Sequence, residues 1–440
     1  MMGKRVRLDR HLKAQWSLSA VIVAGLMVAG CGSSDSPSQA NSDSDEATHI
    51  ESDGRLAIAQ ASQSGVHVLN LDDKQMLATV PTDFVPSALY ASPDKRYAVA
   101  IQRTENLVQF IDGGLFQEDH VDHLHDYAQA PALAGMGLTG IRPTHYEVAE
   151  GQAALFMDGD AESGSTAAVV TFSDESVEKG EPDASLPLPM QMHGTAEPRG
   201  AYLLTTWRAP ANTDTLPELV ELYKQEGNSF QFVQRFDIPC PRLHGSYSSE
   251  DYSVFGCQDG VLVIKQVGDD FIATKIDNLP SMPDGARVGT VLGHHESPVF
   301  VGLLANNAMV EIDPQAGTMT SIEWPSTGGR ITAAFDHSAK NLLLLDDLGS
   351  LHALEVAAGW AVKSAIPVTA AIAEDDSRPV LDIHPSADRA FISDPNGKQI
   401  IIVDTASVSV LEQLPLDFVP SSVRWLGISE DHEHEGHTHD

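Results

Sequence analysis

The sequence predicts an all-β protein of the β-propeller class, and three observations lead to this prediction. Short apolar segments separated by polar turns recur along the chain, and successive copies of the pattern begin 41 to 57 residues apart. This spacing is typical of one four-stranded propeller blade. The pentapeptide Asp83–Ser87 is repeated word for word as Asp417–Ser421. The repeating region also begins with three apolar segments and ends with a single one, as expected if the chain ends share a blade.

The clearest copies of the pattern cover residues 86–112 and 379–404. Each contains an extended segment, a polar turn, a second apolar strand and a third strand that ends at Asp. Further copies begin near Pro143, Met190, Pro241, Val288 and Arg330, with a last, incomplete copy at Pro420. These starts predict eight four-stranded blades, or seven if one of the irregular repeats near Met190 or Val288 is misread. A sandwich or a solenoid also has short strands, but neither explains so long a period with four strands in each repeat.

The chain ends are expected to close the ring. Only one strand, residues 422–426, follows the second copy of the pentapeptide, whereas a whole blade follows the first copy. At the other end of the chain, a first strand is missing before the strands at residues 56–59, 66–70 and 75–80. Pairing the C-terminal strand with this group would complete the blade and remove two exposed edges. We therefore expect one propeller domain over residues 54–428.

Residues 1–30 resemble a bacterial lipoprotein signal peptide. A basic stretch precedes the apolar run Trp16–Gly30, which is too short to span a bilayer comfortably. The run ends at Cys31 as in a lipobox, where the cysteine is lipidated and becomes the new N-terminus; a plain signal peptide or a membrane anchor is the alternative. Gly32, and not Asp, follows this cysteine, which by resemblance to lipoprotein sorting favours the outer membrane. Residues 31–53 have little to bury and are expected to form a disordered tether.

The chain is strongly acidic, with a formal net charge of −35. Residues 1–30 contain five basic residues and one acidic residue, so 22 basic and 61 acidic residues remain without them, a formal charge of −39. Such a surface repels phosphate backbones, which excludes nucleic acid as a partner. The acidity would attract cations, or it reflects a salt-loving source, and the composition does not distinguish the two.

Besides Cys31, the chain contains Cys240 and Cys257. In an oxidising compartment, such a pair most often forms a disulfide. The neighbouring residues flank a polar Ser-Ser-Glu turn, and an antiparallel hairpin about residues 248 and 249 would place the two cysteines opposite each other. Two thiolate ligands for zinc are the alternative.

The densest group of metal-ligating side chains lies between residues 119 and 127. It contains His120, His123 and His125 within six residues. Neutral imidazole is the commonest protein ligand for Zn²⁺, so this segment predicts a zinc site. The interleaved carboxylates are expected to hydrogen-bond the ligating imidazoles and fix their orientation; they are Asp119, Asp122 and Asp126. The alternative is a solvated polar loop without a metal.

Four more histidines occur near the predicted starts of first strands in consecutive blades: His145, His193, His244 and His294. First strands line the centre of a propeller, so we expect these side chains to converge around one channel mouth. The His-rich segment precedes the strand that carries His145, which would place it beside the same mouth. His337 and His384 occur in similar places in later blades, but within turns, and we expect them to be structural.

The C-terminal residues 429–440 form an acidic tail that contains His432, His434, His437 and His439. A disordered segment of this composition is typical of weak, fast metal capture. Zn²⁺ suits all these ligands best. Cu²⁺ and Ni²⁺ also bind imidazole, so the ligand type alone does not decide between the metals.

Taken together, the motifs resemble the periplasmic zinc metallochaperones of the AztD family. The shared motifs are His120-x-x-His-x-His-Asp-Tyr, Arg142-Pro-Thr-His, His193-Gly, Cys240-Pro-x-Leu-His-Gly and Gly256-Cys-x-Asp-Gly-Val, and the resemblance covers most of residues 54–425. It implies a β-propeller that binds zinc and passes it directly to the solute-binding protein of a zinc ABC importer. The lipobox and the His-rich tail depart from the family pattern, and membrane tethering would limit how far this protein carries the ion.

The sequence therefore predicts a monomeric, lipid-anchored zinc carrier in the periplasm, whose partner is a zinc solute-binding protein, and not an enzyme. One alternative is a metal-dependent propeller hydrolase such as a lactonase, with Asp119 or Asp126 as the base. The other is a metal-free propeller that serves as a protein-interaction scaffold. A carrier binds zinc without turning over esters or lactones, whereas an enzyme loses activity on chelation. The sequence contains no nucleophile motif, phosphate loop or haem-attachment motif.

Overall fold

The computed structural model describes residues 49–119, 124–324 and 327–429. The predicted lipobox, most of the predicted tether and the predicted tail from residue 430 lie outside these ranges. All the described residues belong to one compact unit. In the part of the chain that is described, no helix is both long enough and apolar enough to cross a membrane.

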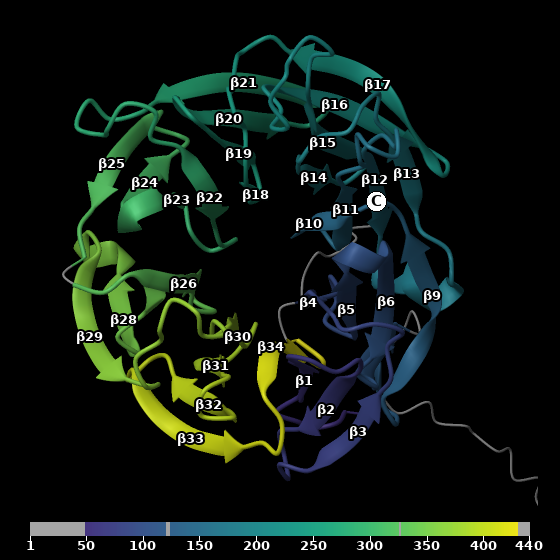
Figure 1. Cartoon of the computed structure of the whole chain (residues 1–440), viewed down its shortest axis with the longest axis vertical. Coiled ribbons are helices and arrows are strands. Elements are labelled where there is room, and N and C mark those ends of the chain that lie inside the picture. The colour runs from purple at the N-terminus through teal and green to yellow at the C-terminus, as the bar shows by residue number, and fades with distance from the viewer. Residues whose placement is uncertain (1–48, 120–123, 325–326, 430–440) are drawn as a thin grey trace, which may run out of the picture. The chain divides into compact units, whose positions relative to one another are not determined.

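The described residues fold into four-stranded units that follow one another around a ring (Figure 1). The first unit contains β1 (Arg55–Gln60), β2 (Val66–Asn70), β3 (Met76–Val80) and the last strand of the chain, β34 (Pro420–Leu426). The second contains β4 (Ala88–Ala91), β5 (Tyr97–Gln102), β6 (Leu107–Asp112) and β9 (Ala132–Thr139). The third contains β10 (Pro143–Ala149), β11 (Gln152–Met157), β12 (Ala168–Phe172) and β13 (Ala184–Pro187). The fourth contains β14 (Ala196–Arg199), β15 (Tyr202–Trp207), β16 (Leu219–Glu226) and β17 (Ser229–Phe236).

The remaining units have the same strand order. The fifth contains β18 (Ser246–Ser248), β19 (Tyr252–Cys257), β20 (Gly260–Val267) and β21 (Asp270–Asp277). The sixth contains β22 (Val288–Leu292), β23 (Phe300–Leu304), β24 (Met309–Asp313) and β25 (Thr318–Ile322). The seventh contains β26 (Arg330–Phe335), β27 (Asn341–Asp346), β28 (Ser350–Glu355) and β29 (Ala361–Pro367). The eighth contains β30 (Leu381–Ile383), β31 (Arg389–Asp394), β32 (Gln399–Asp404) and β33 (Ser409–Pro415). Connecting segments contain the helix α1 (Asp174–Lys179) and the short 3-10 helices η1 (Arg103–Glu105), η2 (Ala305–Asn307) and η3 (Val356–Ala358).

The third and fourth units are joined into one eight-stranded sheet by a single parallel pair, Ser185 in β13 and Ser229 in β17. The described residues therefore form seven separate sheets of four or eight strands, or eight four-stranded units if the two halves are counted apart. Both counts are consistent with the all-β propeller predicted from the repeats.

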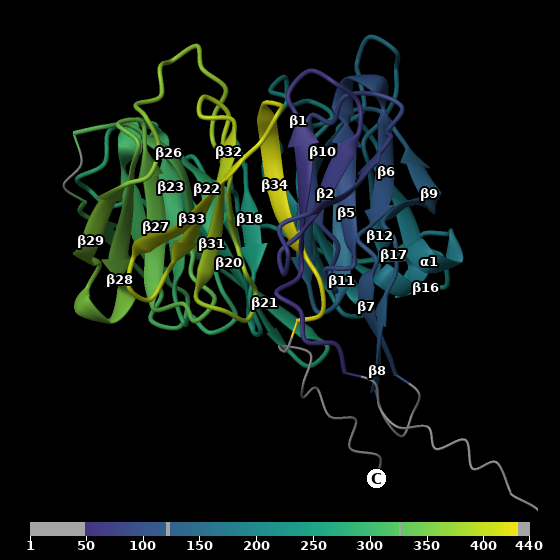
Figure 2. The ribbon, with the colours of Figure 1, turned by 90° about the horizontal axis from the view of Figure 1, so that it is seen from below.

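The two ends of the propeller region share the first unit, as the sequence predicts. β1 pairs antiparallel with β34, with Leu56 opposite Trp425 and Ile58 opposite Val423. Figure 2 shows β34 lying beside β1. The Trp425 ring is buried, and its Nε1–H donates a hydrogen bond to the carbonyl oxygen of Asp53 at 3.0 Å. The pairing leaves neither chain end with an exposed sheet edge at this point.

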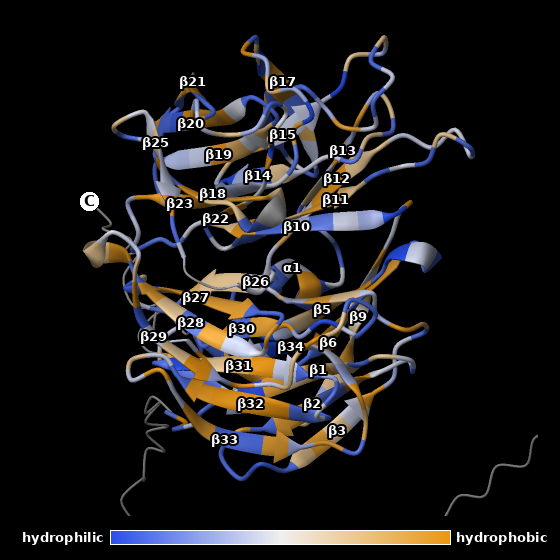
Figure 3. Cartoon of the chain, turned by 60° about the vertical axis from the view of Figure 1, so that its left-hand side comes forward, coloured by the Kyte–Doolittle hydropathy of each residue, from blue (hydrophilic) through white to orange (hydrophobic). Residues whose placement is uncertain are grey.

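The middle strands are apolar at successive positions because both faces of each sheet pack against neighbouring sheets. All six residues of β5 are buried. Tyr97, Val99 and Ile101 pack in a core shared with the third unit, whereas Ala98 and Ala100 pack in a core shared with the first unit. Figure 3 shows the same hydrophobic character along β31 and β32. The outermost strand β33, by contrast, buries one residue of seven.

One insertion departs from the four-strand pattern. The strands β7 (Leu115–Asp119) and β8 (Leu124–Ala128) form a two-stranded hairpin between β6 and β9, called the His-rich hairpin below. The sequence analysis expected this segment to precede the strand that carries His145 and to lie beside the channel mouth. Instead, β9 is the strand that pairs with β6, and the hairpin projects away from the sheets (Figure 2).

Candidate metal centre

Three of the predicted histidines come together where first strands begin. His145 lies in β10, His193 lies three residues before β14, and His244 lies two residues before β18. The Nε2 atoms of His145 and His193 are 3.3 Å apart, and those of His193 and His244 are 3.1 Å apart. These residues, called the His triad below, each offer one ring nitrogen within 4.8 Å of the others. In the described ranges, no other three His, Cys, Asp or Glu side chains converge in this way.

The hydrogen bonds around the His triad determine which ring nitrogens face its centre. Nδ1 of His193 lies 3.0 Å from a carboxylate oxygen of Asp158, and Nδ1 of His244 lies 2.7 Å from the carbonyl oxygen of Gly289. Because an ionised carboxylate and a carbonyl can only accept, each Nδ1 must be the donor. In neutral imidazoles, Nε2 then carries a lone pair and no proton. Two such lone pairs 3.1 Å apart repel each other unless a cation lies between them.

The spacing of the His triad suits zinc. Zinc–nitrogen bonds of about 2.0–2.1 Å in a tetrahedral site place two ligating nitrogens about 3.3 Å apart. The separations of 3.3 Å between His145 and His193 and of 3.1 Å between His193 and His244 agree with this value. Three imidazoles also leave the fourth position open for a water molecule or for a ligand from another protein. Cu²⁺ and Ni²⁺ accept imidazole as well, so the donor set fits these metals too.

Asp158 orients His193, and it was not among the residues predicted from the sequence. Its side chain is buried, and the oxygen that faces His193 also accepts hydrogen bonds from Arg103 at 2.8 Å and from Thr144 at 3.0 Å. A carboxylate bonded to a ligating imidazole fixes the ring and raises its basicity. We expected Asp119, Asp122 and Asp126 in this role because they alternate with histidines in the sequence. Asp158 reaches the site only because β10 and β11 pair antiparallel, which brings the end of β11 beside Thr144.

Burial favours the neutral, metal-binding form of two histidines of the triad, His145 and His244. Burial, followed by the charges of His193 and His244, lowers the pKa of His145 to about 3. Burial also lowers the pKa of His244, against the opposing effect of its hydrogen bond to Gly289. Protons compete with a metal ion for each imidazole, so these lowered pKa values reduce that competition at neutral pH.

His294 does not join the His triad, although it was predicted at an equivalent position. The three triad histidines lie at or before the beginnings of first strands, whereas His294 lies two residues after the end of β22. The beginning and the end of a strand lie at opposite ends of its sheet, so His294 is at the other end from the triad. It occupies the same kind of turn as His337 after β26 and His384 after β30.

The surroundings of His294 are those of a turn residue. Its ring stacks on the ring of His295 with centroids 4.2 Å apart, and its Nδ1 accepts a hydrogen bond from the backbone N–H of Glu296 at 3.1 Å. Burial lowers its pKa to about 4. The sixth unit contributes a backbone group to the triad instead, because Gly289 near the beginning of β22 supplies the acceptor for His244.

The His-rich hairpin also lies at the opposite end of the sheets from the His triad. It follows the end of β6, where Asp112 pairs with Tyr97 at the beginning of β5. The Phe116 ring of the hairpin lies under the Arg96 guanidinium, 3.6 Å from it, and Arg96 belongs to the turn that follows the end of β4. For His125, the hairpin histidine that the structure describes, the predicted placement beside His145 is therefore corrected. The reason is strand direction, since an insertion after a third strand emerges where first strands end.

The structure describes only part of the predicted hairpin site. His125 lies opposite Glu118, and Asp126 is buried, accepting hydrogen bonds from the Ile50 N–H and the Gln117 side chain at 2.8 Å each. His49 Nδ1 lies 3.1 Å from Asp126. The other predicted residues of the hairpin and tail lie outside the described side chains: Asp119, His120, Asp122, His123, His432, His434, His437 and His439. Their role in metal binding stays a prediction.

The predicted disulfide between Cys240 and Cys257 is confirmed, but the hairpin register that suggested it differs. The two Cα atoms are 4.9 Å apart, and both side chains are fully buried. β18 pairs with β19 with Ser246 opposite Phe255, which centres the turn on residues 250 and 251 and not on 248 and 249. Cys240 therefore lies outside the strand pairing, and the segment between it and β18 carries His244.

Comparisons with known proteins agree with the sequence motifs. No protein-family model matches the chain. The chain is 25% identical to the zinc chaperone AztD of Citrobacter koseri over 398 residues, which is 88% of this chain and 90% of that protein.

Solved structures establish the fold. The structure of apo AztD from Citrobacter koseri matches with a TM-score of 0.74 at 24% identity, over 85% of this chain and 98% of that one. The dihydro-heme d1 dehydrogenase NirN in complex with DHE matches with a TM-score of 0.55 at 13% identity, over 86% of this chain and 76% of that one. The resemblance of this chain to the AztD zinc-chaperone family, predicted from its motifs, is confirmed along most of its length.

Proposed function

We propose that this protein is a zinc carrier that holds Zn²⁺ at the His triad and gives it directly to the solute-binding protein of a zinc ABC importer. The observation that carries the proposal is the convergence of three Nε2 atoms, two of them in rings whose Nδ1 proton has a fixed acceptor. The similarity to a zinc chaperone supports the same reading.

The ligand set suits handover to a partner. Three protein ligands leave one coordination position free, and an acceptor ligand can fill it before any bond to the triad breaks. The His193 side chain is 30% exposed, so the bound ion can be reached from outside the protein. The remaining imidazoles can then be replaced one at a time, and the ion never enters water without ligands.

The rest of the chain is assigned roles that follow from its sequence. We propose an eight-bladed propeller over residues 54–428, attached by a lipid on Cys31 and the tether 31–53 to a membrane facing the periplasm, with the outer membrane favoured. The tail 429–440 and the His-rich hairpin would collect zinc more weakly. The carrier acts as a monomer, and the formal charge of −39 that remains without residues 1–30 attracts cations.

The proposal is tested by mixing the zinc-loaded protein with the metal-free solute-binding protein and an excess of a chelator of intermediate affinity. Transfer should be faster than spontaneous zinc loss and insensitive to the chelator concentration. His193→Ala should abolish both tight binding and transfer. His294→Ala is the matched control, because this histidine lies at the other end of the sheets, and it should preserve both. If the chelator intercepts zinc in proportion to its concentration, the protein is a buffer or store and not a chaperone.

A metal-dependent hydrolase is the second candidate, because three imidazoles with one open position also occur in catalytic zinc sites. The same zinc-loaded protein distinguishes the two functions. A carrier leaves esters and lactones intact, whereas turnover that disappears on chelation and in His193→Ala would identify the hydrolase.

A further inference from the structure

We infer that the Cys240–Cys257 disulfide and the close backbone approach at Gly256 together position His244 for metal binding. This inference rests on the proposed function, because it assigns a role in that site to residues that do not touch the ion. The unit formed by the disulfide and Gly256 is called the His244 clamp below.

The His244 clamp encloses the segment that carries the ligand. His244 lies four residues after Cys240, and Gly256 directly precedes Cys257. The His244 N–H donates a hydrogen bond to the Gly256 carbonyl at 2.9 Å, and the Gly256 N–H donates to the Gly245 carbonyl at 3.0 Å. The disulfide attaches the beginning of the segment to the end of β19, and these hydrogen bonds attach its end to the same strand.

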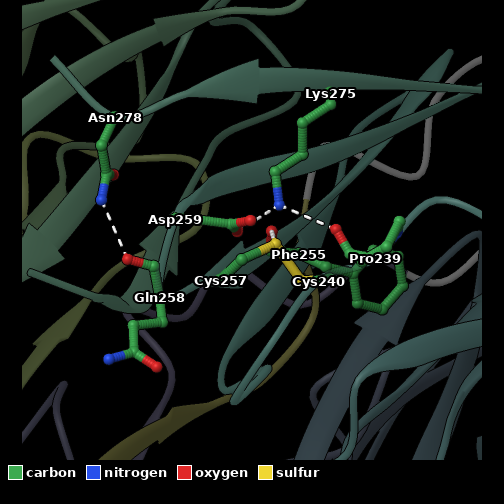
Figure 4. Close-up of a disulfide and its surroundings, with 8 residues drawn as sticks. All are labelled: Pro239, Cys240, Phe255, Cys257, Gln258, Asp259, Lys275 and Asn278. Carbon is green, nitrogen blue, oxygen red and sulfur yellow. Dashed lines mark hydrogen bonds and ion pairs between the residues drawn. A yellow bond between two sulfur atoms is a disulfide. The ribbon is translucent and has the colours of Figure 1, made fainter. Parts of the chain in front are cut away.

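Further contacts hold both cysteines in place. The Gln258 N–H donates a hydrogen bond to the Pro241 carbonyl at 2.8 Å. The Lys275 ammonium donates to the Pro239 carbonyl at 2.9 Å and pairs with Asp259, so it links the residues that flank the two cysteines (Figure 4). Leu243, the neighbour of His244, is buried in the same core as both sulfur atoms. The backbone before His244 is therefore tied down on several sides.

Gly256 allows the next unit to approach the ligand. A Cβ atom at this position would lie 2.3 Å from the Val288 carbonyl oxygen and 2.8 Å from the His244 carbonyl oxygen. Both neighbours are backbone atoms, so a side chain here would push both β22 and the His244 segment away from β19. The residue after Val288 is Gly289, whose carbonyl accepts the Nδ1 proton of His244. The absence of a side chain at Gly256 therefore helps to set the orientation of the His244 ring.

His193 and His244 are oriented by different kinds of hydrogen-bond acceptor. A side chain, Asp158, accepts the His193 proton, whereas a backbone carbonyl accepts the His244 proton. The geometry of His244 consequently depends on how two backbone segments are held together, which is what the clamp does. Loosening the clamp should affect the contribution of His244 and leave the contribution of His145 in place.

The test uses the full chain with the hairpin and tail histidines replaced by Ala, so that the triad is the remaining predicted site. The replaced residues are His120, His123, His125, His432, His434, His437 and His439. In this background, the double variant Cys240→Ala/Cys257→Ala should weaken zinc binding about 10-fold or more, as measured by chelator competition. Gly256→Ala, with the disulfide formed, should give a similar loss. If the cysteine variant fails to fold, Gly256→Ala alone decides the question.

A double-mutant cycle separates positioning from general destabilisation. In a His244→Ala background, neither clamp variant should weaken zinc binding further by more than about twofold. In a His145→Ala background, each clamp variant should still weaken binding by more than about twofold. Trp425→Ala, which destabilises a remote part of the fold, should leave the affinity unchanged. Equal losses in both histidine backgrounds, or no loss in either, would overturn the inference. Unchanged affinity on His193→Ala in the starting chain would instead refute the proposed function.

Discussion

His193 donates its Nδ1 proton to Asp158 across 3.0 Å, and this hydrogen bond determines which ring nitrogen faces the centre of the His triad. The same carboxylate oxygen accepts hydrogen bonds from Arg103 and Thr144, which prevent it from turning away. The metal-binding properties of the triad therefore depend on a residue that is not itself a ligand.

Replacing Asp158 by Asn should weaken zinc binding about 10- to 100-fold. The amide removes the negative charge and can present its NH₂ group to His193, which would favour the other ring tautomer. The dissociation constant is measured by chelator competition. Asp160→Asn is the matched control. Asp160 lies two residues after Asp158 and pairs with Arg142, so this variant should change the zinc affinity less than about twofold. Equal affinities for the two variants would contradict this role of Asp158.

The His triad and the His-rich hairpin should bind zinc independently, because they lie at opposite ends of the sheets. His125→Ala should leave the tight site intact, and His193→Ala should leave the weaker hairpin and tail sites intact. The combined variant should lose the sum of the two effects, as expected for distant sites. Zinc stoichiometry and affinity, measured by titration, check this expectation. A loss of the tight site in His125→Ala would show that the two regions form one site.

Trp425→Ala should destabilise the protein by about 3–5 kcal/mol. The ring is buried between β1 and the eighth unit, and its Nε1–H satisfies the Asp53 carbonyl, so the change leaves both a cavity and an unpaired acceptor in the blade that closes the ring. The free energy of unfolding is measured by chemical denaturation. Leu411→Ala on the exposed strand β33 should cost less than about 0.5 kcal/mol. Comparable losses in the two variants would argue against the importance of this closure.

His384 should make the folded protein less stable in mild acid. Burial, followed by the charge of Arg389, lowers its pKa to about 4, and its ring lies against Trp425 with centroids 4.4 Å apart. In the unfolded chain the pKa is about 6.5. Between these values the unfolded chain binds a proton that the folded protein excludes. The contribution of His384 to the free energy of unfolding is therefore present in full above pH 6.5. On the order of 3 kcal/mol of it is lost as the pH falls towards 4.

The measurement compares the wild type with His384→Asn, whose side-chain oxygen can still accept the hydrogen bond that the Ser386 N–H donates to the ring. The difference in unfolding free energy between the two proteins should shrink as the pH falls from 6.5 to 4. A difference that stays constant over this range would assign the acid sensitivity to other groups.

The local sequence pattern was sufficient to predict the strands and the pairing of the first and last strands that closes the fold. Apolar runs such as that of β5 are needed wherever a strand is buried on both faces, so their recurrence predicted the units, and the unpaired strands at the two ends predicted the pairing of β1 with β34. The cysteine count likewise predicted the disulfide, although its hairpin register was wrong by two positions at the turn.

The tertiary structure decided which histidines meet. Strand direction separates the His-rich hairpin and His294 from the triad, because a shift of a few residues from the beginning to the end of a first strand moves a side chain to the opposite end of the sheet. Strand register brings Asp158 to His193, and the contact between two units brings the Gly289 carbonyl to His244. A local pattern records which faces of a strand are buried, but direction, register and contacts between units depend on residues far apart in the chain.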